Sequence, residues 1–229
     1  MTSGWEPGTG GVRALILSGA GAYADPWHRF SHTSQRLAGL LAGLGYGVEV
    51  SEDLPRRVRD LDDVDLLVVN AAGGPSGAVR ADVQDALDRY LDRGRGLLAV
   101  HVGVGSLLDL PDWAEVSGAA WIPGRSTHPP LGPCTVDVRP GAHPISAATA
   151  SFEVVDERYV HLDLREGSTV IATHEHEGVI HPLVWARTVR ASRVVADALG
   201  HGVQSFDSAG HRALLRAAAA WLTEPATLP

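Results

Sequence analysis

Residues 96–106, with the sequence GLLAVHVGVGS, form an apolar run that ends in a histidine and a glycine-rich turn. The small and aliphatic residues before His101 predict a strand that is buried on both faces, as in parallel sheets. Open α/β sheets bind ligands at the carboxyl ends of their strands, which is where His101 lies. The run therefore predicts a functional His101. The alternative is a histidine that only caps the strand and hydrogen-bonds a neighbouring loop.

Chain length and charge restrict the kind of protein further. A chain of 229 residues that is 45% hydrophobic can bury one large core, so we expect a single domain over residues 12–222. Residues 1–11 are expected to form a flexible leader and residues 223–229 a tail. The net charge of −8 and the lack of a basic cluster argue against nucleic acid and anionic membranes as partners.

The cellular compartment is predicted from the single cysteine and the polar N-terminus. Cys134 cannot form an internal disulfide, and no apolar signal core or membrane-spanning run is present. We therefore expect a cytoplasmic protein. Cys134 lies in an alternating strand pattern and is interpreted as a small, buried apolar residue.

Strand and helix patterns alternate along the chain. A helix over residues 78–93 between strands at 65–70 and 96–100 implies a parallel crossover. Other patterns predict strands at 12–17, 48–50, 134–138, 151–155, 169–173, 183–187 and 193–198, and helices at 32–44 and 211–222. This order predicts the α/β class, with a mostly parallel sheet flanked by helices.

Several histidines follow predicted strands and would meet at one edge of the sheet. The proposed metal ligands are His101, His201 and one of His28 or His32, with Glu157 as a carboxylate and His128 in reserve. Imidazole and carboxylate groups suit zinc or another divalent ion. In contrast, residues 174–177 (HEHE) precede a glycine and are predicted to form an exposed hairpin turn.

Catalytic and substrate-binding groups are sought in the same loops. Glu157 is the proposed acid or base, with His101 as its catalytic partner, because a carboxylate beside a metal or an imidazole can be tuned toward neutral pH. The alternative is that Glu157 only orients its loop through Arg158. The side chains proposed to contact substrate are Asp156 and the aromatic residues Trp27, Trp113, Trp121 and Tyr159, whose flat faces could stack on sugars. The alternative is that some of these aromatic side chains are only packed in the core.

The turn at residues 99–103 resembles the nucleophile turn of class I glutamine amidotransferases, a flavodoxin-like fold with the pattern G-x-C-x-G. Histidine stands here where that pattern has cysteine. Because an imidazole cannot replace the thiolate as nucleophile in amide hydrolysis, the sequence excludes glutamine amidotransferase activity.

Nearly the whole chain resembles the trehalose-utilisation ThuA-like proteins, a branch of this fold. The matching segments are residues 15–19 (LILSG), 90–101 (YLDRGRGLLAVH), Trp113, 128–129 (HP), 143–145 (HPI), 156–159 (DERY), 182–185 (PLVW), 199–201 (LGH) and a last helix that ends at Trp221. The resemblance implies a role in sugar catabolism on disaccharides or their 3-keto derivatives, beside a partner dehydrogenase, and some members look metal-bound. Many members carry a histidine directly after the first glycines, whereas this chain has its first histidines at His28 and His32.

The leading hypothesis is a carbohydrate-processing enzyme, a metal-dependent hydrolase or lyase of (keto)glycosides. The competing hypothesis is a non-catalytic sugar- or partner-binding protein. It would be favoured if the histidines lie too far apart to share a ligand. A third is a homodimer scaffold that uses the irregular segment 113–133 as its interface.

Overall fold

The computed structural model describes residues 11–74 and 81–225. Of the expected leader, residues 1–10 lie outside the described residues, as do residues 226–229 of the expected tail. The last described helix continues to Thr223.

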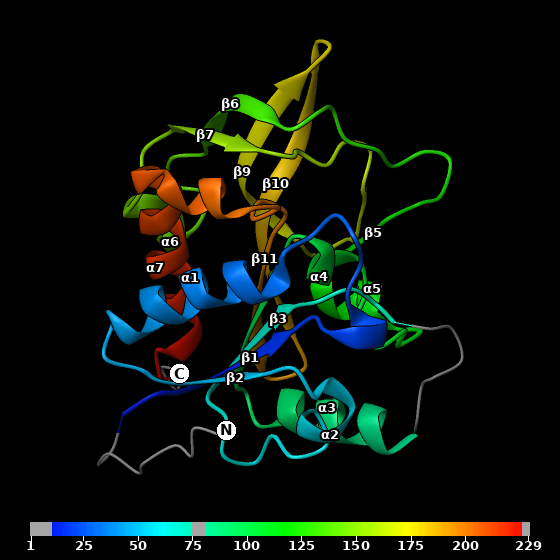
Figure 1. The fold of residues 1–229 in the computed structure, drawn as a ribbon. Helices are drawn as coiled ribbons and strands as arrows, with labels where there is room; N and C mark the ends of the chain where they lie inside the picture. Colours follow the sequence, from blue (N-terminus) through cyan, green and yellow to red (C-terminus); the bar gives the residue numbers. More distant parts are fainter. Residues whose placement is uncertain (1–10, 75–80, 226–229) are drawn as a thin grey trace.

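Within the described residues, nine strands form one sheet, in the order β2-β1-β3-β4-β11-β10-β9-β6-β7 (Figure 1). The five from β2 to β11 are parallel, and β10, β9, β6 and β7 extend the sheet in antiparallel pairs. Their bounds are β1 (Arg13–Ser18), β2 (Gly47–Ser51), β3 (Leu66–Asn70), β4 (Gly96–Val100), β6 (Gly132–Val138), β7 (Phe152–Asp156), β9 (Thr169–His176), β10 (Val179–Val189) and β11 (Ser192–Asp197). The predicted α/β class is confirmed.

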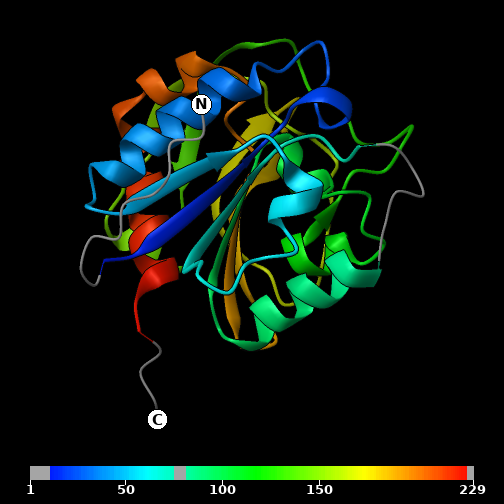
Figure 2. The ribbon, with the colours of Figure 1, turned by 60° about the horizontal axis from the view of Figure 1, so that its bottom comes forward.

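Helices cover both faces of the sheet. α1 (Phe30–Ala42) and α7 (Ala209–Thr223) pack together on one face, and α2 (Leu54–Arg57) and α3 (Ala81–Asp92) lie on the other (Figure 2). The shorter elements are η1 (Gly21–Tyr23), α4 (Val102–Gly105), α5 (Trp113–Ser117), β5 (Ala119–Ala120), α6 (Pro144–Ala147), β8 (Asp163–Leu164) and η2 (Val203–Asp207). Segment 113–133, which was expected to be irregular, therefore contains a short helix and a strand.

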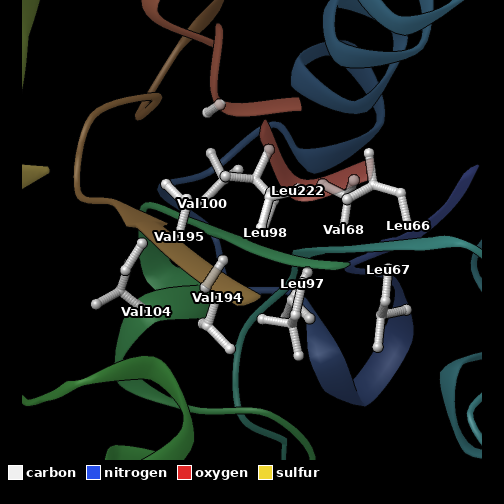
Figure 3. Close-up of a cluster of buried hydrophobic side chains, with 14 of the residues drawn as sticks. Leu66, Leu67, Val68, Leu97, Leu98, Val100, Val104, Val194, Val195 and Leu222 are labelled. Atoms are coloured by element: carbon white, nitrogen blue, oxygen red, sulfur yellow. The ribbon is translucent and has the colours of Figure 1, made fainter. Parts of the chain in front are cut away.

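Alternate side chains of the central strands fill the two halves of the core (Figure 3). Leu66, Val68 and Leu98 lie on the side of Leu222 from α7, and Leu67 and Leu97 point to the opposite side. All of these strand residues are at most 1% exposed. A strand covered on both faces must be apolar at every position, which explains why these runs do not alternate with polar residues.

The hairpin of β9 and β10 corrects one expectation. β9 extends through His176, and only Glu177 and Gly178 form the turn. His174 is 1% exposed and its Nε2 lies 3.1 Å from the Tyr159 carbonyl, so the prediction that it lies in an exposed turn was wrong. Burial lowers the pKa of His174 to about 4.

A buried polar network joins α7 to the sheet. His211 Nε2 lies 2.8 Å from an Asp197 carboxylate oxygen of β11, and His211 Nδ1 lies 2.8 Å from Ser205 Oγ. Ser205 in turn donates to Asp156. Although serine, histidine and aspartate are also the residue types of a hydrolytic triad, Ser205, His211 and Asp197 are each 0% exposed. The network is therefore structural.

No helix in the described ranges 11–74 and 81–225 is both long and apolar enough to cross a bilayer.

Stability should depend on the charge of His211. Burial lowers the pKa of His211, but the Asp197 carboxylate, Asp156 and the Ser205 carbonyl together outweigh burial, and the pKa is raised overall. A raised folded-state pKa stabilises the protein fully below the unfolded value of about 6.5, and this stabilisation is lost as pH rises through the folded-state pKa. We expect the free energy of unfolding to fall above about pH 6.5 by at most about 1.4 kcal/mol per pH unit from this group.

Urea unfolding of the wild type and of His211→Gln across pH 6–9 measures this effect. The difference between the two proteins should shrink as pH rises. A difference that stays constant with pH would show that His211 does not titrate in this window.

Candidate metal centre

Four side chains from distant parts of the chain converge at one edge of the sheet. They are His28 from the loop after β1, His101 at the end of β4, Glu157 after β7 and His201 after β11. One ligand atom from each lies within 4.8 Å of all the others. We call these four residues the histidine–glutamate cluster.

His101 occupies a strained turn between β4 and α4. Its φ of 48° and ψ of −111° lie outside the regions that residues with a side chain ordinarily adopt. The His101 amide donates to the Asp197 carbonyl at 2.7 Å, which fixes the turn to β11. Gly103 permits α4 to lie against β3, because a Cβ there would come 2.3 Å from the Val69 carbonyl oxygen.

His28 is oriented by Asp25 three residues earlier. The Asp25 carboxylate accepts hydrogen bonds from the amides of Trp27 and His28 at 2.9 Å and lies 2.7 Å from His28 Nδ1. At the adjoining start of α1, Asn70 from the end of β3 donates to the hydroxyls of Thr33 and Ser34. These contacts fix the loop that carries His28 to the sheet.

Glu157 and His201 are both positioned by Asp156. This carboxylate accepts from the amides of Gly200 at 2.7 Å and His201 at 3.1 Å, as well as from the Glu157 amide at 2.8 Å. Burial raises the pKa of Asp156, and the hydrogen bonds from Ser205 and Gly200 oppose this effect. Asp156 is 0% exposed, so the prediction that it contacts substrate was wrong.

Glu157 lies between three imidazole rings. Its Oε2 is 3.0 Å from His201 Nδ1 and 3.9 Å from His101 Nε2, and its Oε1 is 3.2 Å from His128 Nδ1. His128 lies at the margin of the cluster, with 38% of its side chain exposed. The carboxylate thus faces the other cluster residues with one oxygen and His128 with the other.

The donor set fits a divalent metal ion. His28 Nε2 and His101 Nε2 are buried without a hydrogen-bond partner among the described residues, and His201 Nδ1 lies near Glu157 without hydrogen-bond alignment. The second nitrogens of two rings do have partners, since His28 Nδ1 contacts Asp25 and His101 Nδ1 lies 2.8 Å from the Ala198 carbonyl. Metal-binding histidines characteristically use their second nitrogen in this way, which aims the first at the ion.

Burial also keeps two of these rings in the form that binds metals. The pKa of His101 lies well below its ordinary value because burial disfavours the charged ring, and burial likewise lowers the pKa of His201. A neutral imidazole offers the lone pair that zinc and similar ions require.

The remaining predicted residues lie in different surroundings. α1 begins at Phe30, so His32 lies exposed in its first turn and outside the histidine–glutamate cluster. Trp113 is 2% exposed and donates to the Gly103 carbonyl at 2.9 Å, so its predicted stacking on substrate was wrong. Tyr159 is 8% exposed and stacks on His101 with a centroid distance of 4.6 Å. Trp27 is 74% exposed.

A pocket of about 320 Å³ opens beside His201. It is lined by Trp27, Arg29, His32, Gln204 and neighbouring residues, and we call it the polar pocket.

Arg29 and Gln204 were not predicted from the sequence, because no motif marks them. Asp25 was also missed as the partner of His28, although an aspartate three residues before a histidine was a usable signal.

The chain is similar to known proteins in sequence and in fold. The family model ThuA, described as trehalose utilisation, matches residues 13–222. A ThuA-like protein from Parabacteroides merdae superimposes with a TM-score of 0.78 at 17% identity, over 96% of this chain and 93% of that one. No curated protein sequence matches this chain.

Two further solved structures share the fold at low identity. A glutamine amidotransferase from Thermotoga maritima gives a TM-score of 0.57 at 13% identity, over 93% of this chain and 99% of that one. A β-galactosidase from Rahnella sp. R3 gives 0.65 at 17% identity, over 94% of this chain and 32% of that one.

Metal binding should depend on the cluster and not on the neighbouring histidine. We expect tag-free protein to bind about one zinc or similar ion, and His101→Ala to weaken binding at least about 100-fold through the loss of one ligand. His32→Ala, the matched control from the same region, should bind like the wild type. Elemental analysis and zinc titration measure both. A wild-type protein without metal, whose melting temperature does not respond to added zinc, would contradict the assignment.

Proposed function

The chain belongs to the ThuA family, described as trehalose utilisation, and on this basis we propose that it is a metal-dependent enzyme that cleaves a keto-glycoside in sugar catabolism. The observation that carries the proposal is the convergence of three imidazole nitrogens and one carboxylate beside a polar pocket. Histidines too far apart to share a ligand would instead have favoured a non-catalytic binding protein.

The polar pocket offers the groups that bind a sugar ring. The exposed indole of Trp27 presents a flat apolar face on which the C–H side of a sugar can stack. Arg29 and Gln204 add several hydrogen-bond donors and an acceptor for hydroxyl groups. Arg29 has no carboxylate within ion-pair distance in the described part of the chain, so its guanidinium is available to a ligand.

The three histidines would hold the ion. A bound divalent ion would supply Lewis-acid polarisation of the substrate carbonyl oxygen. Three protein ligands are the number that catalytic zinc sites use when they keep a position open for substrate. Glu157 then remains free to act on a proton.

Glu157 is the proposed base for the step that the keto group permits. A proton on the carbon between the carbonyl and the anomeric carbon passes to Glu157, and its electron pair forms a carbon–carbon double bond as the glycosidic C–O bond breaks. The released alkoxide takes up the proton from Glu157. His128 lies beside this carboxylate, with its Nδ1 3.2 Å from Glu157 Oε1. Atoms and charge balance without a redox partner, although an earlier dehydrogenase must supply the keto group.

Glu157→Gln tests the base directly. The amide keeps the size of the side chain but cannot accept the proton, so turnover of a 3-keto-glycoside should fall about 10²- to 10⁴-fold. Elemental analysis of the same protein should show an unchanged metal content. If the variant loses the metal, Glu157 is a fourth ligand of the ion. If the variant keeps full turnover, Glu157 is not the base.

Trp27→Ala tests the polar pocket as the site that binds the sugar. Because Trp27 is exposed, its removal should leave the fold and the metal content intact. Loss of stacking should raise KM for the keto-glycoside roughly three- to tenfold with little change in kcat. An unchanged KM would place the sugar elsewhere.

A further inference from the structure

A second pocket, of about 210 Å³, lies beside Tyr159, whose ring stacks on His101. Its lining is dominated by Val102, Val104, Trp121, Tyr159 and Leu162, and we call it the apolar pocket. Among the residues that line it, polar side-chain atoms come only from Ser106, the Tyr159 hydroxyl and the Trp121 indole nitrogen. The apolar pocket thus differs in chemistry from the polar pocket beside His201.

Aromatic contacts connect the apolar pocket to the histidine–glutamate cluster. Tyr159 stacks on His101 at 4.6 Å, and Trp121 meets Tyr159 edge-on at 5.1 Å. Trp121 also lies 6.4 Å from His128, whose Nδ1 is 3.2 Å from Glu157. His201 of the cluster lines the polar pocket, and Tyr159, which stacks on His101, lines the apolar pocket, so both pockets adjoin the cluster.

The apolar pocket suits a flat apolar ring better than a second sugar. A cavity of about 150 Å³ with an aliphatic and aromatic lining is large enough for benzene, so 210 Å³ accommodates a substituted phenyl ring. A sugar ring would bring several hydroxyl groups into a lining that offers few partners, and each unpaired hydroxyl would cost free energy.

From these contacts we infer that the apolar pocket is the leaving-group subsite and that the substrates are glycosides of aromatic alcohols rather than disaccharides. This inference rests on the proposed function, because it assigns the two pockets to the two halves of one glycoside. It adds the chemical class of the group that the cleavage releases.

Binding of two glycosides to the full-length protein tests the subsite without turnover. Isothermal titration calorimetry should show phenyl β-glucoside binding about tenfold or more tighter than methyl β-glucoside, because only the former buries a ring in the apolar pocket. Gly105→Leu should abolish this ratio by filling the pocket, since a Cβ on Gly105 would lie 3.8 Å from the Trp121 Cβ, its nearest neighbour. Trp121→Ala should reduce the ratio by removing a wall, and at 37% exposure it is the substitution less disruptive to folding.

The outcomes separate the two proposals. The subsite is overturned if the wild type binds the phenyl and methyl glucosides equally tightly or binds neither. It is also overturned if the preference for the phenyl glucoside remains in both Gly105→Leu and Trp121→Ala. A phenyl preference that both variants lose supports it, even where no keto-glycoside is turned over and the proposed reaction fails. Turnover of keto-glycosides without a phenyl preference would keep the reaction and remove the subsite.

Discussion

The buried carboxylate of Asp156 is the interaction on which the candidate site depends. It gathers the amides of Glu157, Gly200 and His201 and the Ser205 hydroxyl around one charge. A buried carboxylate is stable only when such donors compensate its lost hydration. Removing it would release two of the four residues of the histidine–glutamate cluster at once, although Asp156 is not itself one of the four.

His101 shows how one backbone arrangement can serve a different chemistry. The turn between β4 and α4 holds a side chain in strained geometry at the carboxyl end of the sheet, where the amidotransferase pattern has a nucleophile. Here the same strained turn holds an imidazole, whose Nε2 lone pair points to the histidine–glutamate cluster where the amidotransferase pattern has a thiolate. The Asp197 carbonyl holds the His101 backbone amide and the Ala198 carbonyl holds the ring through Nδ1, so the position is preorganised for a ligand.

The sequence predicted the gathering of residues better than the role of each one. His101, His201 and one of His28 or His32 could be grouped because the loops after the parallel strands β1, β4 and β11 meet at one edge, and Glu157, after the antiparallel β7, was added as a carboxylate. Asp156 and Glu157 show the limit: they are neighbours in sequence, yet one is buried and the other faces the cluster. Trp113 and His174 were misplaced for the same reason, since the burial of a single side chain is decided by tertiary packing that no local pattern records.

The four cluster residues are spread along most of the chain, from the first loop to the last strand of the sheet. No fragment, hairpin or folding intermediate that lacks either end can assemble them, so an ion meets the complete set only in the native state. An ion bound at the cluster would then stabilise the whole domain and not one element. Occupancy of the site and folding of the chain would in this way be coupled, since each favours the other.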